Sequence, residues 1–151
     1  MRFTTRTEYG LVCLIYMSKH SEVPFDPITI KELVQAEQFS LTYTEKIMQT
    51  LRTANIVTAQ HGNQGGYALA RPASQITLRE IVEALEGATF EIFCKPEVRE
   101  EIICTHFPAC GIKPVWEKTK SVLDRLYDSI TLEMIAKNEL ESASLSGIPK
   151  P

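Results

Sequence analysis

Three cysteines lie close together in the second half of the chain, and their side chains are the ones best suited to chemistry. Cys94, Cys104 and Cys110 fall within 17 residues, with nine residues between the first two and five between the last two. Thiolates are soft ligands that suit iron–sulfur clusters and zinc. Since three thiolates leave one coordination position of a cluster open, a fourth group must fill that position or it stays accessible.

Two other interpretations of this cysteine segment remain open. His106 lies between the last two cysteines and could complete a zinc site with the three thiolates, although the spacing is unlike that of common zinc pairs. The thiols could also act without a metal, as oxidation sensors or ordinary loop residues. The fourth cysteine, Cys13, stands on the apolar face of a predicted helix, so we expect it in the core.

The composition is that of an ordinary globular chain. Its 151 residues are 44% hydrophobic and 23% charged, which is enough apolar material for a real core. The net charge of -3 excludes polybasic binding, but it does not exclude a nucleic-acid partner, because one basic face suffices. Residues 1–75 carry seven Lys and Arg against six Asp and Glu, whereas residues 76–151 carry nine against thirteen. The first half is therefore more suited than the second to contact the phosphates of a nucleic acid.

The chain shows no membrane or secretory segment. Its longest apolar run, from Leu11 to Met17, is far shorter than the roughly 18 residues that a span needs. No small-residue cleavage site follows the N-terminus. We therefore expect a cytoplasmic protein with no membrane partner, whose thiols stay reduced and are not structural disulfides.

Before the cysteines, the sequence predicts three helices and a hairpin. An apolar pattern covers 5–19, a capping box of Thr29 and Glu32 opens a short helix that ends near 38–40, and a third helix runs over 41–54 with Ser40 as N-cap. Two β-rich segments, 56–60 and 67–70, flank a turn with three glycines. In the third helix we expect Leu41, Ile47, Met48, Leu51 and Ala54 on the core face and Thr42, Tyr43, Glu45, Lys46 and Gln49 on the outer face.

The second half contains further helices. A capping box of Thr77 and Glu80 begins one that stops at Gly87, and Pro114 stands in the first turn of a longer one. In that longer helix, apolar and small residues fall at spacings of four and three, which indicates a narrow seam for pairing with another helix. A short helix is predicted near 131–137.

The predicted fold is mainly α with a small β-hairpin: a winged helix-turn-helix DNA-binding domain plus a long C-terminal dimerisation helix. We divide the chain into a winged helix-turn-helix over 1–87, a cysteine-containing cluster loop over 88–112, a dimerisation helix and short helix over 113–140, and a flexible tail over 141–151. The polar face of 41–54 suits the DNA major groove, and the hairpin suits the adjoining backbone or minor groove. The pattern alone fits equally well a helical core with an exposed polar face.

Four stretches carry a resemblance to a known family. They are 1–4 (MRFT), 41–47 (LTYTEKI), 62–72 (GNQGGYALARP) and 76–87 (ITLREIVEALEG). With them the chain resembles the Rrf-type family of bacterial winged-helix regulators, which includes the iron–sulfur regulator IscR, the nitric-oxide sensor NsrR and the cysteine-metabolism regulator CymR. The resemblance implies a homodimer, paired through the helix at about 114–129, that reads a pseudo-palindromic double-stranded DNA operator.

The resemblance also implies which residues meet the DNA. Glu45 stands where IscR-like proteins carry a glutamate used in site discrimination, and a carboxylate can accept from the cytosine amino group. As an alternative, Glu45 is only a helix-surface partner of Gln49 or a capping residue to Thr42. At the hairpin tip His61 replaces the family's usual arginine, so a permanent charge is missing there. The implied contacts are Thr42, Tyr43, Glu45, Lys46 and Gln49 on the helix and His61, Asn63 and Gln64 on the hairpin.

In IscR-like and NsrR-like members, a three-cysteine loop at this place holds an iron–sulfur cluster, [2Fe–2S] or [4Fe–4S]. The spacing of the last two cysteines matches theirs, and the gap after Cys94 is longer. IscR-like proteins add a histidine three residues after the last cysteine, where this chain has Lys113. NsrR-like members carry an acidic residue in the first helix, which here is Glu8, reaching from the partner subunit. The alternatives are that Glu8 only favours the helix dipole, or that His106 is the ligand.

These features predict a repressor whose operator affinity is switched by an iron–sulfur cluster that senses iron, redox state or nitric oxide. The alternative is a cluster-free, CymR-like member that responds to a partner protein or a small ligand. An enzyme is poorly supported, because the sequence has no phosphate-binding loop, nucleophile elbow or paired-histidine metal motif.

Overall fold

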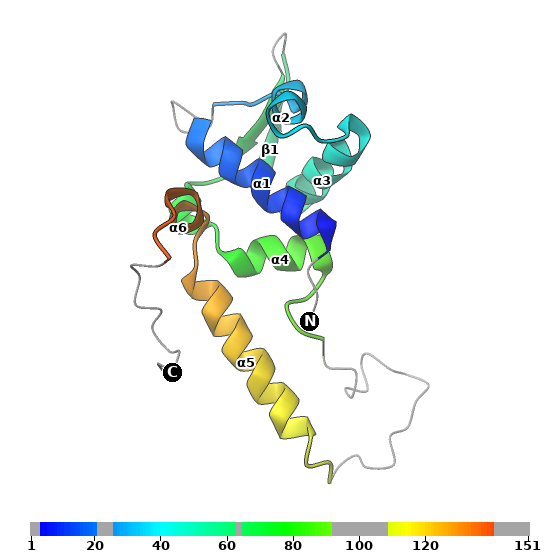
Figure 1. Ribbon diagram of the computed structural model, residues 1–151, viewed down its shortest axis with the longest axis vertical. Helices are drawn as coiled ribbons and strands as arrows, with labels where there is room; N and C mark the ends of the chain where they lie inside the picture. The colour runs from blue at the N-terminus through cyan, green and yellow to red at the C-terminus, as the bar shows by residue number, and fades with distance from the viewer. Residues whose placement is uncertain (1–3, 21–25, 63–64, 92–108, 141–151) are drawn as a thin grey trace.

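The computed structural model describes residues 4–20, 26–62, 65–91 and 109–140 (Figure 1). The cysteine segment between 92 and 108 and the predicted tail over 141–151 lie outside these residues. The observed chain is mainly helical with one small hairpin, as the sequence predicts. Its elements are α1 (Thr5–His20), α2 (Ile30–Glu37), α3 (Leu41–Thr53), β1 (Val57–Gln60), β2 (Gly66–Leu69), the 3-10 turn η1 (Ala73–Gln75), α4 (Leu78–Glu86), α5 (Lys113–Ser129) and α6 (Leu132–Lys137).

The two predicted capping boxes are both formed. At the start of α2, Thr29 Oγ1 accepts from the Glu32 backbone N–H at 3.2 Å, and the Glu32 carboxylate accepts from the Thr29 N–H at 2.7 Å. Thr77 and Glu80 repeat this arrangement at the start of α4. The expected cap at the start of α3 is only partly present. Ser40 is the N-cap residue, but its side chain caps no backbone N–H, and the helix begins on its carbonyl oxygen instead.

Helix α1 supplies the centre of the hydrophobic core, and α3, α4 and α6 pack around it. Cys13 is completely buried there, as predicted. Gly10 marks the crossing of α1 over α4, since a Cβ at this position would lie 2.5 Å from Leu85 Cδ1. The fully buried core side chains include Leu14, Met17, Leu33, Met48, Leu51, Ile76, Ile81 and Leu132.

The hairpin is antiparallel and is fixed to the segment before α2. Val57 pairs with Leu69 at one end, and Gln60 pairs with Gly66 at the other. Ile28 and Tyr67 exchange two backbone hydrogen bonds, of 2.8 and 2.9 Å, on the outer side of β2. A side chain at Gly66 would bring its Cβ to 2.6 Å from the Ile28 carbonyl oxygen. Glycine at this position therefore lets the hairpin lie directly against the start of α2.

Helix α5 projects away from the packed helices, and only its C-terminal part reaches α4 (Figure 1). After α5 the chain turns back, because Leu78 N–H donates to the Ile130 carbonyl and Leu132 N–H donates to the Ile76 carbonyl, both at 2.8 Å. This return places α6 against α1. None of the helices in the described part of the chain has the length and apolar character that a membrane span requires.

The predicted core face of α3 is wrong at both of its ends. The Leu41 side chain is 48% exposed and Ala54 is exposed, whereas Thr44, which the pattern leaves unassigned, is completely buried. The Thr44 hydroxyl is satisfied by donating to the Ser40 carbonyl at 3.0 Å. Helical periodicity gives the direction of a side chain, but it does not tell how far along the helix the core extends.

Candidate nucleic-acid interface

The outer face of α3 presents most of the side chains that the sequence assigns to DNA contact. Thr42, Glu45, Lys46 and Gln49 are exposed. Tyr43 is only half-exposed, because its ring packs edge-on against Tyr9 of α1 with the centroids 5.6 Å apart. Tyr43 therefore links the outer face of α3 to the core. On the hairpin His61 is exposed, and Asn63 and Gln64 lie outside the described residues.

A groove of about 600 Å³ runs between the start of α2, one side of α3 and the hairpin. From α3 it is lined by Leu41, Glu45 and Arg52, whose spacing of four and seven residues places them on one side of the helix. Thr42, Lys46 and Gln49 do not line it. The helix thus exposes two neighbouring strips, one of which faces the hairpin.

The charges around this groove favour an anionic partner. The cationic side chains of Lys31 and Arg52 line it, and Glu45 is the only acidic residue among the described lining residues. Positively charged side chains beside the exposed face of α3 suit contacts to phosphate, which position a protein on DNA. Sequence reasoning missed Arg52 and placed Leu41 in the core. The spacing of Arg52 from Glu45, seven residues, was the signal that could have identified Arg52.

Arg71 holds the base of the hairpin in place. Its guanidinium donates to the Asn55 carbonyl at 2.9 Å and the Gln75 carbonyl at 3.0 Å, and it pairs with Glu80 at 2.5 Å. Partial burial acts to raise the pKa of Glu80, but hydrogen bonds from Thr77 and Arg71 outweigh it and hold that pKa below the usual value. Asn55 adopts a left-handed conformation, with a φ of 56°, which asparagine tolerates better than most residues. The turn between α3 and β1 is therefore joined to the start of α4.

The described cysteines have opposite surroundings. Burial, together with the nearby Glu37 carboxylate, raises the pKa of the Cys13 thiol to about 12. Cys13 thus remains protonated and cannot serve as a thiolate ligand. Cys110 is half-buried, forms no disulfide and lies just before α5, where its carbonyl accepts from the Lys113 N–H at 3.3 Å. Cys94, Cys104 and His106 lie outside the described residues.

Within the described ranges, no three His, Cys, Asp or Glu side chains gather into a metal site. Glu8 is exposed in the first turn of α1. The N-terminal ends of α1 and α5 lie well apart in Figure 1.

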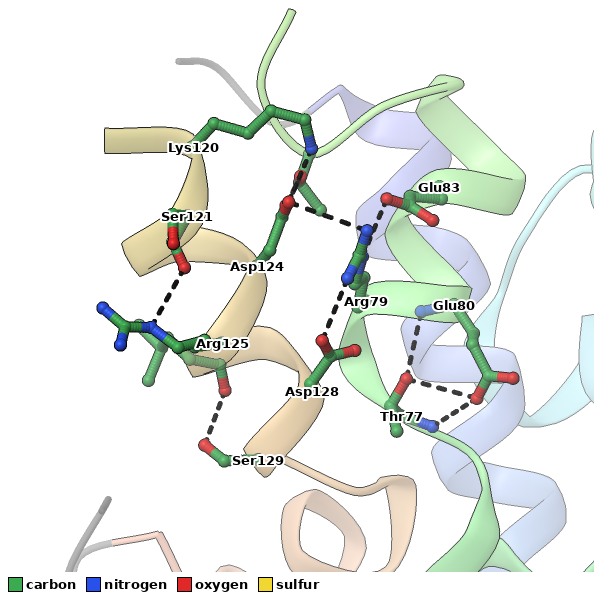
Figure 2. Close-up of polar contacts among 12 residues, drawn as sticks. Thr77, Arg79, Glu80, Glu83, Lys120, Ser121, Asp124, Arg125, Asp128 and Ser129 are labelled. Atoms are coloured by element: carbon green, nitrogen blue, oxygen red, sulfur yellow. Dashed lines mark hydrogen bonds and ion pairs between the residues drawn. The ribbon is translucent and has the colours of Figure 1, made fainter. Parts of the chain in front are cut away.

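A polar joint connects α4 to α5 (Figure 2). Arg79 pairs with Glu83 at 2.9 Å and with Asp128 and Asp124 across the joint at 3.0 and 3.6 Å. Asp124 also accepts from Lys120 at 2.6 Å and from the buried Thr89 hydroxyl at 2.5 Å. Burial acts to raise the pKa of Asp124, but these donors and the charges of Lys120 and Arg79 keep it below the usual value.

The joint also fixes the start of the segment that leads to the cysteines. Thr89, which is bonded to Asp124, is followed by Phe90, whose ring lies against Trp116 of α5 with the centroids 6.0 Å apart. Two successive residues of the connection after α4 are therefore held on α5.

Comparison with known proteins identifies the chain's relatives. The family model described as Rrf2, iron-dependent transcriptional regulator, matches residues 3–138. The regulator NsrR of Oceanobacillus iheyensis is 29% identical over 150 residues, which are 99% of each chain. The solved structure of CymR, the global cysteine regulator of B. subtilis, is similar with a TM-score of 0.70 and 28% identity over 91% of this chain and 98% of CymR. The structure of T. potens IscR gives a TM-score of 0.67 and 26% identity over 100% of this chain and 94% of IscR.

These relatives confirm both the predicted fold and the predicted class of protein. The likeness extends over the helices and the hairpin together, and the named relatives are transcriptional regulators and not enzymes. A helix with an exposed polar face beside a hairpin is thus the winged helix-turn-helix of a DNA-binding protein. The chain belongs to the Rrf2 family of transcriptional regulators.

Proposed function

We propose that this regulator is a homodimeric repressor that binds a pseudo-palindromic double-stranded DNA operator, and that an iron–sulfur cluster switches its affinity for that operator. The observation that carries the proposal is the exposed polar face of α3, which lies beside the hairpin and beside the groove that Lys31 and Arg52 line. Thr42, Tyr43, Glu45, Lys46 and Gln49 would meet base edges and phosphates in the major groove. The hairpin tip, with His61, Asn63 and Gln64, would meet the neighbouring backbone or minor groove.

The exposed apolar side chains of α5 support a dimer. Val115 is 53% exposed, and Trp116 and Val122 are also exposed. Val115 and Val122 line a shallow groove together with Lys118, Thr119 and Leu123. A single subunit leaves this surface in water, whereas two α5 helices packed together would bury it. Pairing at this face would place two α3 helices at a fixed separation, which a pseudo-palindromic operator requires.

We propose that the cluster is held by Cys94, Cys104 and Cys110, with Glu8 of the partner subunit as the fourth ligand. Cys110 fits this role, because it is an accessible free thiol at the start of the proposed dimer helix. When bound, an iron–sulfur cluster supplies a centre that oxidants and nitric oxide can alter. The chain itself would transmit that change, since Thr89 and Phe90 tie the beginning of the cysteine segment to α5, and α5 is tied to α4.

A cluster-free regulator is the second candidate. The strong likeness to the CymR structure supports it, because that protein is described as a cysteine regulator. In this case a partner protein or a small ligand would change the operator affinity, and the three cysteines would be sensors or ordinary residues. A zinc site that includes His106 is a third arrangement of the same segment.

The visible absorption spectrum of anaerobically purified protein, with iron, sulfide and zinc analysis, separates these candidates. A cluster gives visible absorption with iron and sulfide in similar amounts, and operator affinity that changes when the cluster is removed. Colourless protein without iron supports the cluster-free candidate, and one zinc per chain supports the zinc site.

The fourth ligand is tested by Glu8→Ala in anaerobic protein. Because a carboxylate is a hard ligand for iron, its loss should alter the spectrum or shorten the lifetime of the cluster in the presence of nitric oxide. Glu37→Ala, a change of another helical glutamate, is the matched control. A Glu8→Ala protein that matches wild type in spectrum, iron content and reactivity would move the assignment to His106 or to solvent.

A further inference from the structure

Leu41 is a large aliphatic residue in an unexpected place. It is the first residue of α3, and 48% of it is exposed. The other large hydrophobic residues that are exposed in the described ranges all lie on α5 or directly before it. The proposed dimer face can account for those, but Leu41 lines the groove beside the hairpin and is not on that face. Leu41 is therefore exposed on the side of the molecule that we propose to face DNA.

The side chains around Leu41 indicate what it would contact. Glu45 follows it by four residues, so the two side chains are neighbours on the same side of α3, and both line the groove. In the major groove the C5-methyl of thymine is the apolar group on the base edges, while the cytosine amino group is a donor that suits a carboxylate. An aliphatic side chain beside a carboxylate thus suits a thymine next to the base that Glu45 reads.

We propose that Leu41 is a specificity-determining residue that contacts the methyl group of a thymine in each operator half-site. This inference rests on the proposed placement of α3 in the major groove. Removing water from a methyl group and a leucine side chain favours binding wherever the methyl is present. At the same position uracil lacks the methyl, and cytosine presents a polar amino group in place of the thymine carbonyl.

The start of α3 is held firmly enough to aim this side chain. Phe39, two residues earlier, stacks on Tyr9 with the ring centroids 3.9 Å apart. The Thr44 N–H donates to the Ser40 carbonyl at 2.9 Å. Because these contacts involve neighbours of Leu41 and not its own side chain, truncating Leu41 should leave the helix in place.

The test uses duplexes selected by the whole protein from a random library of about three helical turns. Both the anaerobic protein and its chelator-treated form enter the selection. Each thymine of the selected duplex is then replaced by uracil, which removes one methyl group and nothing else. The affinities of wild type, Leu41→Ala, Leu41→Met and Lys46→Ala are measured by fluorescence anisotropy, after thermal unfolding has shown that each variant is folded.

For wild type, uracil at one thymine of each half-site should weaken binding about threefold to fivefold, the effect of one buried methyl group. Leu41→Ala should bind the thymine duplex more weakly and should lose this sensitivity at the same position, so that the two changes are not additive. Leu41→Met, which is of similar size, should retain the sensitivity. Lys46→Ala should weaken binding to every duplex and keep the sensitivity.

The contrary outcomes are distinct. If uracil has no effect on wild type at any position, or the same effect on Leu41→Ala as on wild type, the Leu41 contact is wrong. The placement of α3 on DNA stands in that case if Lys46→Ala still weakens binding. If neither Leu41→Ala nor Lys46→Ala changes affinity, another element reads the DNA, and both this inference and the proposed role of α3 are wrong.

Discussion

Cys13 and Cys110 show that the surroundings of a cysteine decide whether its thiol can act as a metal ligand. Both are free cysteines, but Cys13 is completely buried in the core, whereas Cys110 is half-buried beside the start of α5. Ligation requires the thiolate, and burial raises the pKa of Cys13 to about 12. Cys13 is therefore the internal control for every experiment on the other cysteines.

We expect Cys94→Ala, Cys104→Ala and Cys110→Ala each to lose visible absorption and bound iron, because alanine supplies no ligand atom. Cys13→Ala should keep both. It should lower the free energy of unfolding by about 1 kcal/mol, since one buried heavy atom is removed from the core. Absorption spectra and iron analysis of anaerobic protein measure the first effect, and urea unfolding measures the second. Cluster loss in Cys13→Ala together with retention in Cys104→Ala would contradict the assignment.

Glu86 joins the end of α4 to the beginning of α1. Its carboxylate accepts from the Thr4 N–H at 3.1 Å, from the Thr4 hydroxyl at 2.5 Å and from the Thr7 hydroxyl. These hydrogen bonds from Thr4 and Thr7 lower the pKa of Glu86. Because the folded state lowers this pKa, the stabilisation is fully present above the pKa of the unfolded chain and is lost as the pH falls through the folded value.

Glu86→Gln should therefore lower the free energy of unfolding by about 1 kcal/mol at neutral pH, where the carboxylate is a stronger acceptor than the amide. The difference from wild type should shrink at an acidic pH below the lowered folded-state pKa, where the wild-type carboxyl is itself protonated. Urea unfolding at the two pH values measures this. Glu91→Gln, a change of an exposed glutamate shortly after α4, is the control. If Glu86→Gln lowers the free energy of unfolding equally at both pH values, the loss comes from the changed shape of the side chain and not from its missing charge.

At the scale of the elements, the polar joint between α4 and α5 holds the projecting helix α5 against the helix α4. Asp124 is central to this joint, because its carboxylate forms ion pairs with Lys120 and Arg79 and accepts a hydrogen bond from the buried Thr89 hydroxyl. The Asp124 side chain is only 16% exposed. Its removal would leave Thr89 without its acceptor and Arg79 with fewer partners.

Asp124→Ala should lower the free energy of unfolding by about 1–3 kcal/mol, because a buried donor loses its partner. It should also weaken operator binding, since α5 would no longer be held at one angle to α4. Arg125→Ala is the matched control, because Arg125 is an exposed neighbour whose guanidinium donates to the Ser121 carbonyl of its own helix. Urea unfolding and anisotropy measure the two effects. If Asp124→Ala loses stability but keeps full affinity, the joint does not set the separation of the reading helices.

Local signals in the sequence were sufficient for the helices and the hairpin. The capping boxes at Thr29 and Thr77 placed two helix starts correctly, since the bonds involved span three residues. The exposure of Leu41 and the pairing of Arg79 with Asp128 could not be predicted in this way. The first depends on how far the core extends along α3, and the second joins residues 49 positions apart. The side chains of the reading face were found from their helical spacing and the resemblance, and their contacts to DNA remain predictions.

At the scale of the whole molecule, exposed apolar side chains form a surface on α5 and directly before it in the described chain. Ile112, Val115, Trp116 and Val122 are exposed along α5, on the helix that projects from the rest (Figure 1). A second copy of the chain would bury this surface, and the proposed ligation by Glu8 of the partner subunit requires such a pairing. The proposed operator recognition and the proposed cluster therefore both depend on this one interface.

Val122→Glu tests that interface, because it places a charge at the centre of the apolar surface, where pairing would have to bury it. The variant should be monomeric at micromolar concentration in light scattering, where we expect wild type to be a dimer. It should also bind the operator far more weakly, since each half-site would be bound separately and the gain from simultaneous engagement would be lost. Ser121→Glu adds the same charge to an exposed neighbouring position that lines the polar joint instead of the apolar groove, so it should remain dimeric. If Val122→Glu remains a dimer with full affinity, the subunits pair through another surface, and the proposed reach of Glu8 to the partner's cysteines loses its geometric basis.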